Sequence, residues 1–366
     1  MNVAIIHDWL VTDGGAEKVL RNIIELYPEA DLYTLVDFLD DRDREAVLNG
    51  RYAKISFIQK LPFAKKNFRN YLPVFPKAIE SFDLTKYDLI ISSSWAVAKG
   101  VKTHKDQLHI CYCHTPIRYA WDLYDEYTRD LPFIKKQLVQ ASLKYIRYWD
   151  IKTLGRVDRF IANSEFVKKR IQKTYKRDAQ VIYPPVNTLA FSFCSEKEDY
   201  YLTASRLVPY KKTKLIVEAF NDMPDKKLFV IGAGEEYDAI CKIAKSNITV
   251  MGYQDNEILI NNMRKARAFI YAAVEDFGIV PIEALSCGTP VIALNEGGTA
   301  ETVQDGINGI HFSFQTKEAI IQAVGRFETQ TFDHKSISED TKKYSEVRFR
   351  NEIKGFIEGY DTISRL

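Results

Sequence analysis

Cysteine is sparse in this chain, and the segments that mark a membrane-spanning or secreted protein are missing. The five cysteines are an odd number without a Cys-x2-Cys pair, which argues against a disulfide framework and against a structural zinc site. No apolar run approaches the roughly 18 residues of a membrane span, and the start has no basic segment with a cleavage site. We therefore expect a soluble cytoplasmic protein in which Cys111 and Cys113 are buried strand thiols.

A large excess of charge of either sign is also missing. The 51 Lys and Arg against 49 Asp and Glu give a net charge of +2, too balanced for a protein that coats nucleic acid. The composition is 46% hydrophobic and 27% charged, which indicates a folded globular chain. Because 366 residues are more than one compact core usually holds, we expect two domains.

The positive charge gathers in the first half of the chain. Residues 1–190 carry 30 Lys and Arg against 23 Asp and Glu, a difference of +7, whereas residues 191–366 carry 21 against 26, a difference of −5. Residues 60–77 hold five cations and no acid, and residues 131–177 hold thirteen cations against three acids. Such segments can bind an anionic membrane surface, with Phe63 or Phe68 inserting among the headgroups. The alternative is a solvated helix face whose rings point into the core.

Short β-branched runs alternate with amphipathic stretches along the chain, which is typical of α/β domains with parallel sheets. The prolines within residues 183–187 separate two such series, so we expect domains at 1–185 and 186–345. Ligands bind at the carboxyl edges of such sheets, and we expect a cleft there. The expected strands are 3–8, 31–36, 54–58, 88–92, 108–113, 159–163, 200–203, 227–232, 248–252, 268–272 and 290–294. The expected helices include 16–27, 165–175, 212–220, 235–245 and 256–265.

Gly14 and Gly15 open the helix that follows the first expected strand. Glycines let backbone N–H groups approach an anion, and the helix dipole favours negative charge at this end. The segment is neither Gly-x-Gly-x-x-Gly nor a P-loop with its lysine, so neither a nicotinamide dehydrogenase nor a nucleotide hydrolase follows. On its own, such a pair is also found in ordinary turns.

Arg206, Lys211 and Lys212 surround the start of a helix in the second half of the chain. A guanidinium and an ammonium group that converge there can neutralise a diphosphate without a metal, although an ordinary exposed basic turn has the same composition. Glu275 and Glu283 are separated by seven residues. The turn and the helix start between them place both carboxylates toward one ligand, and their oxygens can accept hydrogen bonds from its hydroxyl groups.

These residues together resemble a known family. The segment GluAspPheGlyIleValProIleGlu at 275–283 is similar to the E-x7-E signature of retaining glycosyltransferases of the GT-B fold, family 4. Further similar segments follow in order along the whole chain, and SerArgLeuValProTyrLysLys at 205–212 and CysTyrCysHisThrPro at 111–116 resemble the O-antigen mannosyltransferase-like branch. The resemblance implies an α/β protein of two Rossmann-like domains, with a final helix at 346–366 that returns to the N-terminal domain.

The resemblance also implies roles for individual residues and a substrate. His114, Glu275, Arg206 and Lys211 would be catalytic, and the enzyme would move a hexose, mannose of GDP-mannose first among them, without a metal or other cofactor. The acceptor would be a lipid-linked glycan at the inner face of the plasma membrane. The implied donor-binding residues are Gly14, Gly15, Arg206, Lys211, Lys212, Gly232, Gly234, Tyr253, Glu275, Phe277, Gly278 and Glu283.

Three residues after His114 are candidates for binding the acceptor. They are Arg118, Tyr119 and Asp122, and the nearby Asp125 is a further candidate, although both aspartates could equally cap the next helix. Asp41 and Asp43 form an Asp-x-Asp pair of the kind that binds metals in another transferase fold, but their polar surroundings favour a solvated turn. The same two-domain plan serves sugar-nucleotide 2-epimerases and phosphorylases, and a non-catalytic sugar-nucleotide sensor at a membrane is a further alternative.

Overall fold

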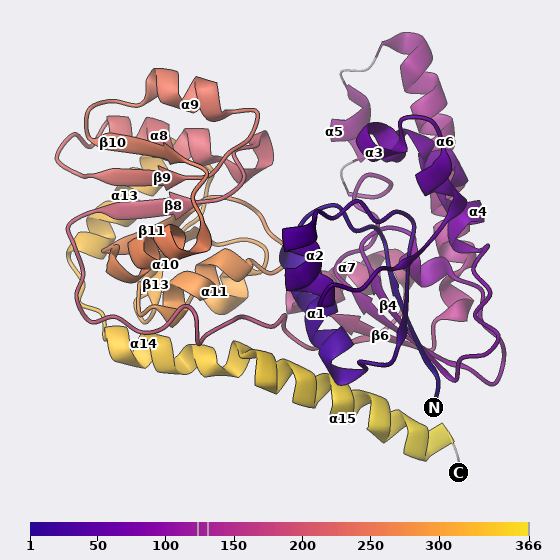
Figure 1. Ribbon diagram of the computed structural model, residues 1–366. Coiled ribbons are helices and arrows are strands. Elements are labelled where there is room, and N and C mark those ends of the chain that lie inside the picture. The colour runs from indigo at the N-terminus through magenta and orange to yellow at the C-terminus, as the bar shows by residue number, and fades with distance from the viewer. Residues whose placement is uncertain (123, 130–131, 365–366) are drawn as a thin grey trace. The chain divides into compact units, whose positions relative to one another are not determined.

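The structure is a computed structural model that describes residues 1–122, 124–129 and 132–364 (Figure 1). The chain divides into two compact units, each of which is described by itself. Unit 1 comprises Met1–Tyr183 and Phe349–Leu366, and unit 2 comprises Pro184–Arg348. No helix within the described ranges is both long and apolar enough to cross a membrane.

Unit 1 is built on a seven-stranded parallel sheet with the order β3-β2-β1-β4-β5-β6-β7. Successive residues of the central strands are buried on opposite faces. Ile5 and Ile91 join one apolar cluster, while Ala4 and Ile90 join another. Such continuous apolar strands are typical of parallel sheets that are covered on both faces. The strands are β1 (Val3–His7), β2 (Asp31–Thr34), β3 (Lys54–Ile55), β4 (Leu89–Ser94), β5 (Leu108–Cys113), β6 (Arg159–Ala162) and β7 (Ala179–Val181).

Helices cover both faces of the unit 1 sheet. One face is covered by the apolar sides of the first and last helices of the chain, which contribute Val19, Leu20, Phe349 and Ile353. The last helix begins in unit 2 and completes the core of unit 1 (Figure 1). The helices of this unit are α1 (Gly15–Leu26), α2 (Asp41–Leu48), α3 (Ala64–Asn67), α4 (Phe75–Ile79), α5 (Tyr124–Arg129), α6 (Phe133–Lys152), α7 (Glu165–Tyr175) and α15 (Glu346–Ser364).

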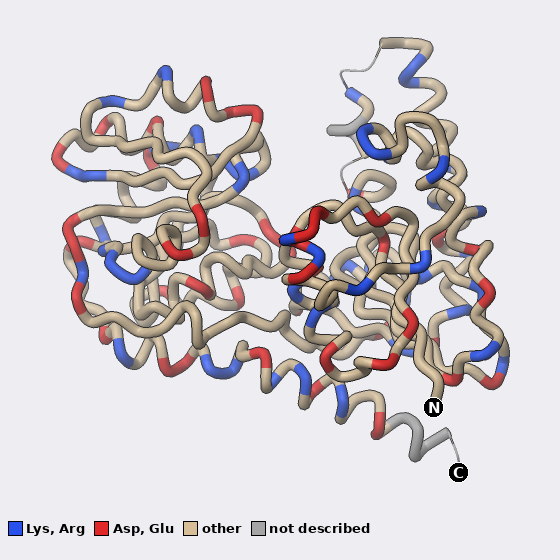
Figure 2. Tube along the Cα trace, viewed as in Figure 1, with Lys and Arg blue, Asp and Glu red and all other residues tan. Residues whose placement is uncertain are grey.

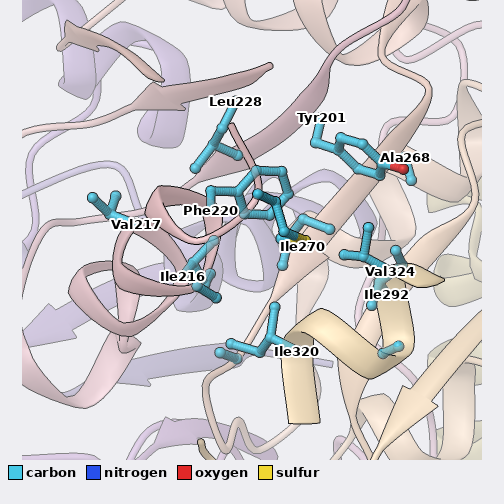
Figure 3. Close-up of a cluster of buried hydrophobic side chains, with 14 of the residues drawn as sticks. Tyr201, Ile216, Val217, Phe220, Leu228, Ala268, Ile270, Ile292, Ile320 and Val324 are labelled. Carbon is cyan, nitrogen blue, oxygen red and sulfur yellow. The ribbon is translucent and has the colours of Figure 1, made fainter. Parts of the chain in front are cut away.

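Unit 2 repeats the plan with a six-stranded parallel sheet of order β10-β9-β8-β11-β12-β13. Its core gathers Tyr201, Phe220, Ile270 and Ile320 from strands and helices of one face (Figure 3). The strands are β8 (Tyr201–Ala204), β9 (Leu228–Ile231), β10 (Ile248–Gly252), β11 (Ala268–Tyr271), β12 (Val291–Leu294) and β13 (Gly309–Phe312). The helices are α8 (Thr213–Asn221), α9 (Tyr237–Ile243), α10 (Asn256–Lys265), α11 (Ile279–Ser286), α12 (Thr299–Thr302), α13 (Lys317–Glu328) and α14 (His334–Asp340).

Several sequence-based expectations need correction. The third strand ends at Ile55 because the Ser56 side chain accepts a hydrogen bond from the Ile58 N–H and starts a 3-10 turn. Asp41 and Asp43 do not lie in a turn but in the first turn of α2, which Asp40 caps. Two short strands, β7 and β13, were not expected.

The buried or exposed state of two groups of side chains was also open. Cys111 and Cys113 lie in β5 as buried free thiols, which confirms the prediction for them. Phe68 is only 2% exposed and packs in the core, so the expectation that it inserts into a membrane is wrong. Phe63, in contrast, is 81% exposed.

Candidate functional site

Arg206 lies on the exposed loop after β8, and two glycines of the loop after β9 hold this segment in place. A side chain at Gly232 would come within 1.9 Å of the Ser205 carbonyl oxygen, and one at Gly234 within 2.3 Å of the Leu207 carbonyl oxygen. Both glycines also have positive φ angles, of 143° and 156°. Only glycine therefore allows the two loops to pack so closely. The contact of these glycines with a nucleotide base stays a prediction.

The basic turn after Arg206 is held by local contacts. The Arg206 guanidinium donates a hydrogen bond of 2.6 Å to the Tyr210 hydroxyl oxygen. Lys212 follows the 3-10 turn Pro209–Lys211 with a φ of 59°, in the left-handed region that favours glycine. Because of this conformation, α8 begins at Thr213, one residue after the expected start at Lys212.

Lys211, Tyr271 and Glu275 form a compact polar cluster in unit 2. The Lys211 ammonium group pairs with the Glu275 carboxylate and donates a hydrogen bond of 3.2 Å to the Tyr271 hydroxyl oxygen. Burial alone would lower the pKa of Lys211, but Tyr271 and Glu275 outweigh it and raise that pKa. Burial and the Glu275 charge likewise raise the pKa of Tyr271. The cluster thus keeps a charged ammonium group in a place that is mostly closed to water.

The loop that carries Glu275 is fixed by a second pair of glycines. A side chain at Gly297 would lie 2.4 Å from the Glu275 carbonyl oxygen, and one at Gly298 would lie 2.2 Å from that of Phe277. The Gly298 N–H donates a hydrogen bond of 2.8 Å to the Glu275 carbonyl oxygen. The Phe277 ring is buried against Tyr344, with 5.7 Å between ring centroids, so the ring serves the core. Only the backbone of Phe277 could meet a sugar.

Glu283 lies on α11, which follows this loop. Gly278 precedes the helix with a φ of 89°, and Pro281 is the third helical residue. Glu283 is 3% exposed, whereas the Glu275 side chain is 20% exposed. Tyr253, after β10, is 71% exposed. The structure therefore brings Glu275 to Lys211 and places Glu283 inside the neighbouring helix.

Gly14 and Gly15 stand at the N-terminus of α1 in unit 1. The Gly14 N–H donates a hydrogen bond of 3.1 Å to Glu17 Oε2, in the manner of a capping box. Glu17 is buried, and its other oxygen lies 3.6 Å from His7 Nε2. Because Glu17 already occupies the Gly14 N–H, a phosphate at this turn would bind the following N–H groups or displace the Glu17 carboxylate. The role of this loop stays a prediction.

His114 directly follows β5 and is 9% exposed. Its Nε2 lies 2.8 Å from the Ser93 hydroxyl oxygen, and the Trp95 and Tyr112 rings contact it edge-on. Burial lowers the pKa of His114 to about 3. His114 is therefore neutral across the range in which most enzymes work.

The three acceptor candidates lie beyond His114. Asp122 forms an ion pair of 2.6 Å with Arg170 Nε. The same guanidinium donates a hydrogen bond of 2.7 Å to the Thr115 hydroxyl oxygen. Arg170 comes from α7, and no local pattern in the sequence indicates that it contacts this segment. Arg118 and Tyr119 are partly buried, and the Asp125 side chain lies outside the described residues. The binding of an acceptor by Arg118, Tyr119 and Asp122 stays a prediction.

The aspartates of the Asp-x-Asp pair serve α2. The backbone N–H of Asp43 donates a hydrogen bond of 2.8 Å to the Asp40 side chain. The Asp43 side chain accepts a hydrogen bond of 3.2 Å from the Asp13 N–H. In the part of the chain that the structure describes, no group of three or more His, Cys, Asp or Glu residues is arranged to hold a metal ion.

Comparison with known proteins places both units. Residues 13–188 match the family model described as Glycosyltransferase Family 4, and residues 189–344 match the one described as Glycosyl transferases group 1. Among solved structures, Anabaena HepE in complex with UDP and glucose has a TM-score of 0.70 at 16% identity. The match covers 97% of this chain and 99% of that one. The predicted fold of two Rossmann-like domains of the GT-B type is confirmed.

Two curated relatives extend the comparison. An uncharacterized glycosyltransferase of Methanocaldococcus jannaschii is 28% identical over 197 residues, which are 51% of this chain. The chain spans about half the length of that relative, since the match covers 54% of it. The alpha-1,3/1,6-mannosyltransferase of Eremothecium gossypii is 23% identical in an alignment 378 positions long, which covers 83% of this chain and 70% of that protein.

Proposed function

We propose that this chain, which belongs to the family 4 and group 1 glycosyltransferases, transfers a hexose from a nucleotide diphosphate sugar to a hydroxyl group of a lipid-linked glycan. Mannose of GDP-mannose is the donor we favour, with support from the mannosyltransferase that is similar over most of the chain. The O-antigen type of surface polysaccharide is the product that the sequence resemblance implies. The observation that carries the proposal is the cluster of Lys211, Tyr271 and Glu275 beside the Arg206 loop.

The chemistry that we propose rests on charge stabilisation. Arg206 and Lys211 hold the diphosphate and stabilise the negative charge that builds on it as the bond to the sugar breaks. Glu275 is paired with Lys211 and therefore orients that ammonium group. In this scheme its carboxylate accepts hydrogen bonds from the sugar hydroxyls and does not attack the carbon that is transferred. The leaving diphosphate itself takes the proton of the acceptor hydroxyl. No metal is needed in this scheme, because the two cations supply the positive charge.

A donor screen tests the function. GDP-mannose, UDP-glucose, UDP-N-acetylglucosamine and UDP-galactose are compared by thermal shift, where a ligand at about 100 times its Kd adds roughly 2.7 kcal/mol. With the donor found, nucleotide release is measured with and without a glycan acceptor. Release that depends on the acceptor supports transfer, whereas conversion of the donor without acceptor would favour an epimerase.

Glu283 provides the matching variant. If its carboxylate holds the ribose hydroxyls, Glu283→Gln should weaken binding of the bare nucleoside diphosphate by about 1.5–3 kcal/mol for each charged hydrogen bond lost. The isosteric change keeps α11 packed, which the melting temperature verifies. Titration calorimetry measures the affinity, and an unchanged Kd would remove Glu283 from the donor site.

The lipid-linked acceptor is supported by the surface of α6. Ile134, Leu138, Tyr145 and Tyr148 follow one another at helical spacing, and all four are large apolar or aromatic side chains that are exposed, between 45% and 75%. Lys135 and Lys144 are exposed on the same helix, and the trace in Figure 2 marks the Lys and Arg positions of the chain in blue. Exposed rings and aliphatic groups beside lysines match an anionic membrane surface in both polarity and charge. We therefore propose that α6 rests on the inner face of the plasma membrane.

The basic segment at residues 60–77 lies in the same region of unit 1 as α6. The 3-10 turn Phe68–Val74 packs against α6. Lys65 and Lys66, just before this turn, are exposed beside the exposed ring of Phe63. Both basic segments thus extend one surface.

Vesicle co-sedimentation tests this surface. Each lysine near an anionic membrane contributes about 1 kcal/mol, so Lys65→Glu/Lys66→Glu should weaken binding to anionic vesicles by at least about 30-fold at low salt. High salt should weaken the native chain in the same direction. The matched control is Lys102→Glu/Lys105→Glu, the same charge change at two exposed lysines between β4 and β5. Equal loss in both variants, or none in either, would mean that the α6 surface is only solvated.

A further inference from the structure

A buried line of polar side chains connects His114 with the loop at the start of α1. His7, Ser93 and His114 come from the carboxyl ends of three neighbouring strands, β1, β4 and β5. His7 and Ser93 are direct register partners. Their side chains, like that of Ile5 two residues before His7, point to the sheet face that α1 covers. The fourth member, Glu17, reaches this face from α1.

The distances along this line are short. Ser93 Oγ lies 2.8 Å from His114 Nε2 and 3.1 Å from His7 Nδ1. His7 Nε2 lies 3.6 Å from Glu17 Oε1, and this nitrogen is buried without a hydrogen-bond partner in the described chain. Glu17 Oε2 accepts the Gly14 N–H at 3.1 Å. His7 and Ser93 are fully buried and Glu17 is 5% exposed, so water does not interrupt the line.

The carboxylate at one end gives the line a direction. An ionised carboxylate only accepts, so when His7 is in its neutral form the ring hydrogen is on Nε2, the nitrogen that faces Glu17. His7 Nδ1 then carries a lone pair and accepts the Ser93 hydroxyl hydrogen. That hydroxyl has no second hydrogen, so its oxygen accepts the hydrogen of His114 Nε2. The remaining ring nitrogen of His114, Nδ1, is left with a lone pair.

We propose that Glu17, acting through His7 and Ser93, fixes His114 in the tautomer with its hydrogen on Nε2, so that Nδ1 accepts a hydrogen bond from a sugar hydroxyl. The sugar as ligand rests on the proposed function. His114 therefore cannot donate to a phosphate oxygen, and Glu17, His7 and Ser93 are positioning residues. The Gly14 N–H on the same carboxylate ties this arrangement to the α1 loop.

The tautomer can be read directly in the free protein. Nitrogen-15 NMR of histidine-labelled protein distinguishes protonated from unprotonated ring nitrogens, and single His→Gln variants assign the six histidines. We expect His114 to be neutral with the hydrogen on Nε2. A hydrogen on Nδ1 in the native protein would overturn the proposal, whatever the activity of the chain turns out to be.

The variant Glu17→Gln gives the sharpest test. The Gly14 N–H keeps the amide oxygen of the new side chain on its own side, so the amide NH2 faces His7 Nε2 and donates to it. Every hydrogen along the line then reverses, and the hydrogen of His114 moves to Nδ1. A His114 signal that is unchanged in Glu17→Gln contradicts the relay.

Ser93→Ala and Ser92→Ala form a matched pair on β4. Ser93→Ala cuts the line, so we expect both tautomers of His114 and a fall in the transfer kcat of about one order of magnitude or more. Ser92 is equally buried but contacts His109 Nε2 at 2.9 Å, and its removal should leave the His114 signal and kcat unchanged. Equal effects of the two variants would indicate a merely structural role. If the donor screen finds no sugar nucleotide, the proposed function fails while the tautomer result stands.

Discussion

Replacement of Lys211 by methionine should lower kcat/KM for transfer by about 10²–10³-fold, the loss seen when one preorganised electrostatic group is removed. Two effects add. In the proposed mechanism the diphosphate loses a cation that burial has taken out of water, and Glu275 loses the ammonium group with which it pairs. Methionine fills nearly the same space, so the packing around Tyr271 is kept. Steady-state kinetics with the donor from the screen measure the change.

Two controls make the Lys211 result specific. Lys214 lies on α8, three residues after Lys211, and its side chain is 47% exposed. Lys214→Met should therefore leave kcat/KM unchanged. Activity of the native protein should also survive excess EDTA, because Arg206 and Lys211 supply the positive charge in the proposed mechanism. A strict requirement for Mn²⁺ or Mg²⁺, or a loss of less than a few fold in Lys211→Met, would contradict that mechanism.

Loss of either partner of the Lys99–Asp150 ion pair should strongly lower the free energy of unfolding. Both side chains are at most 1% exposed, and their charged atoms are 2.6 Å apart. Asp150 also accepts hydrogen bonds from Trp121 Nε1 at 2.9 Å and from the Tyr175 hydroxyl at 3.2 Å. Lys99→Met or Asp150→Asn alone leaves one charge buried without its partner, and each should cost about 3–5 kcal/mol of unfolding free energy. The double variant should cost less than the sum of the two.

Tryptophan fluorescence during urea unfolding measures the unfolding free energy of unit 1, the unit that contains Lys99 and Asp150. All four tryptophans, at positions 9, 95, 121 and 149, belong to unit 1, so the signal does not mix in the unfolding of unit 2. Lys86→Met is the control. Its ion pair with Asp31 is exposed and should contribute at most about 1 kcal/mol. Full additivity of the Lys99 and Asp150 variants would show that the pair is not coupled.

Elements that depend on local pattern could be predicted from the sequence. Apolar runs of five or six residues such as β1 and β5 predict strands. The family motifs point to Lys211 and Glu275 as site residues, and the structure brings these two side chains together. The strands β7 (AlaGlnVal) and β13 (GlyIleHisPhe) could not be recognised, because each has only one β-branched residue, whereas an equally short strand such as β12 is apolar throughout. The sequence indicates the 20-residue helix α6 only as a basic segment, because large apolar side chains such as Ile134 and Leu138 are also exposed and blur the helical pattern.

Partners far apart in the sequence were beyond prediction. Lys211 and Glu275 are 64 residues apart, and Ser93 and His7 are 86 apart. Their contacts follow from strand order and register, which a single sequence does not specify. Arg170 meets Asp122 for the same reason, because α7 follows the strand next to β5 in the sheet. The left-handed backbone at Lys212 also had no signature in a lysine.

The helix α15 has a consequence for synthesis on the ribosome. Phe349, Ile353 and Ile357 of this helix complete the core of unit 1, although that core begins with Val3. Unit 2 has all of its own residues once position 348 has emerged from the exit tunnel. Unit 1, translated first, keeps an apolar face open throughout that time. The residues of the second unit are therefore complete before those of the first, the reverse of the usual N-terminal-first order.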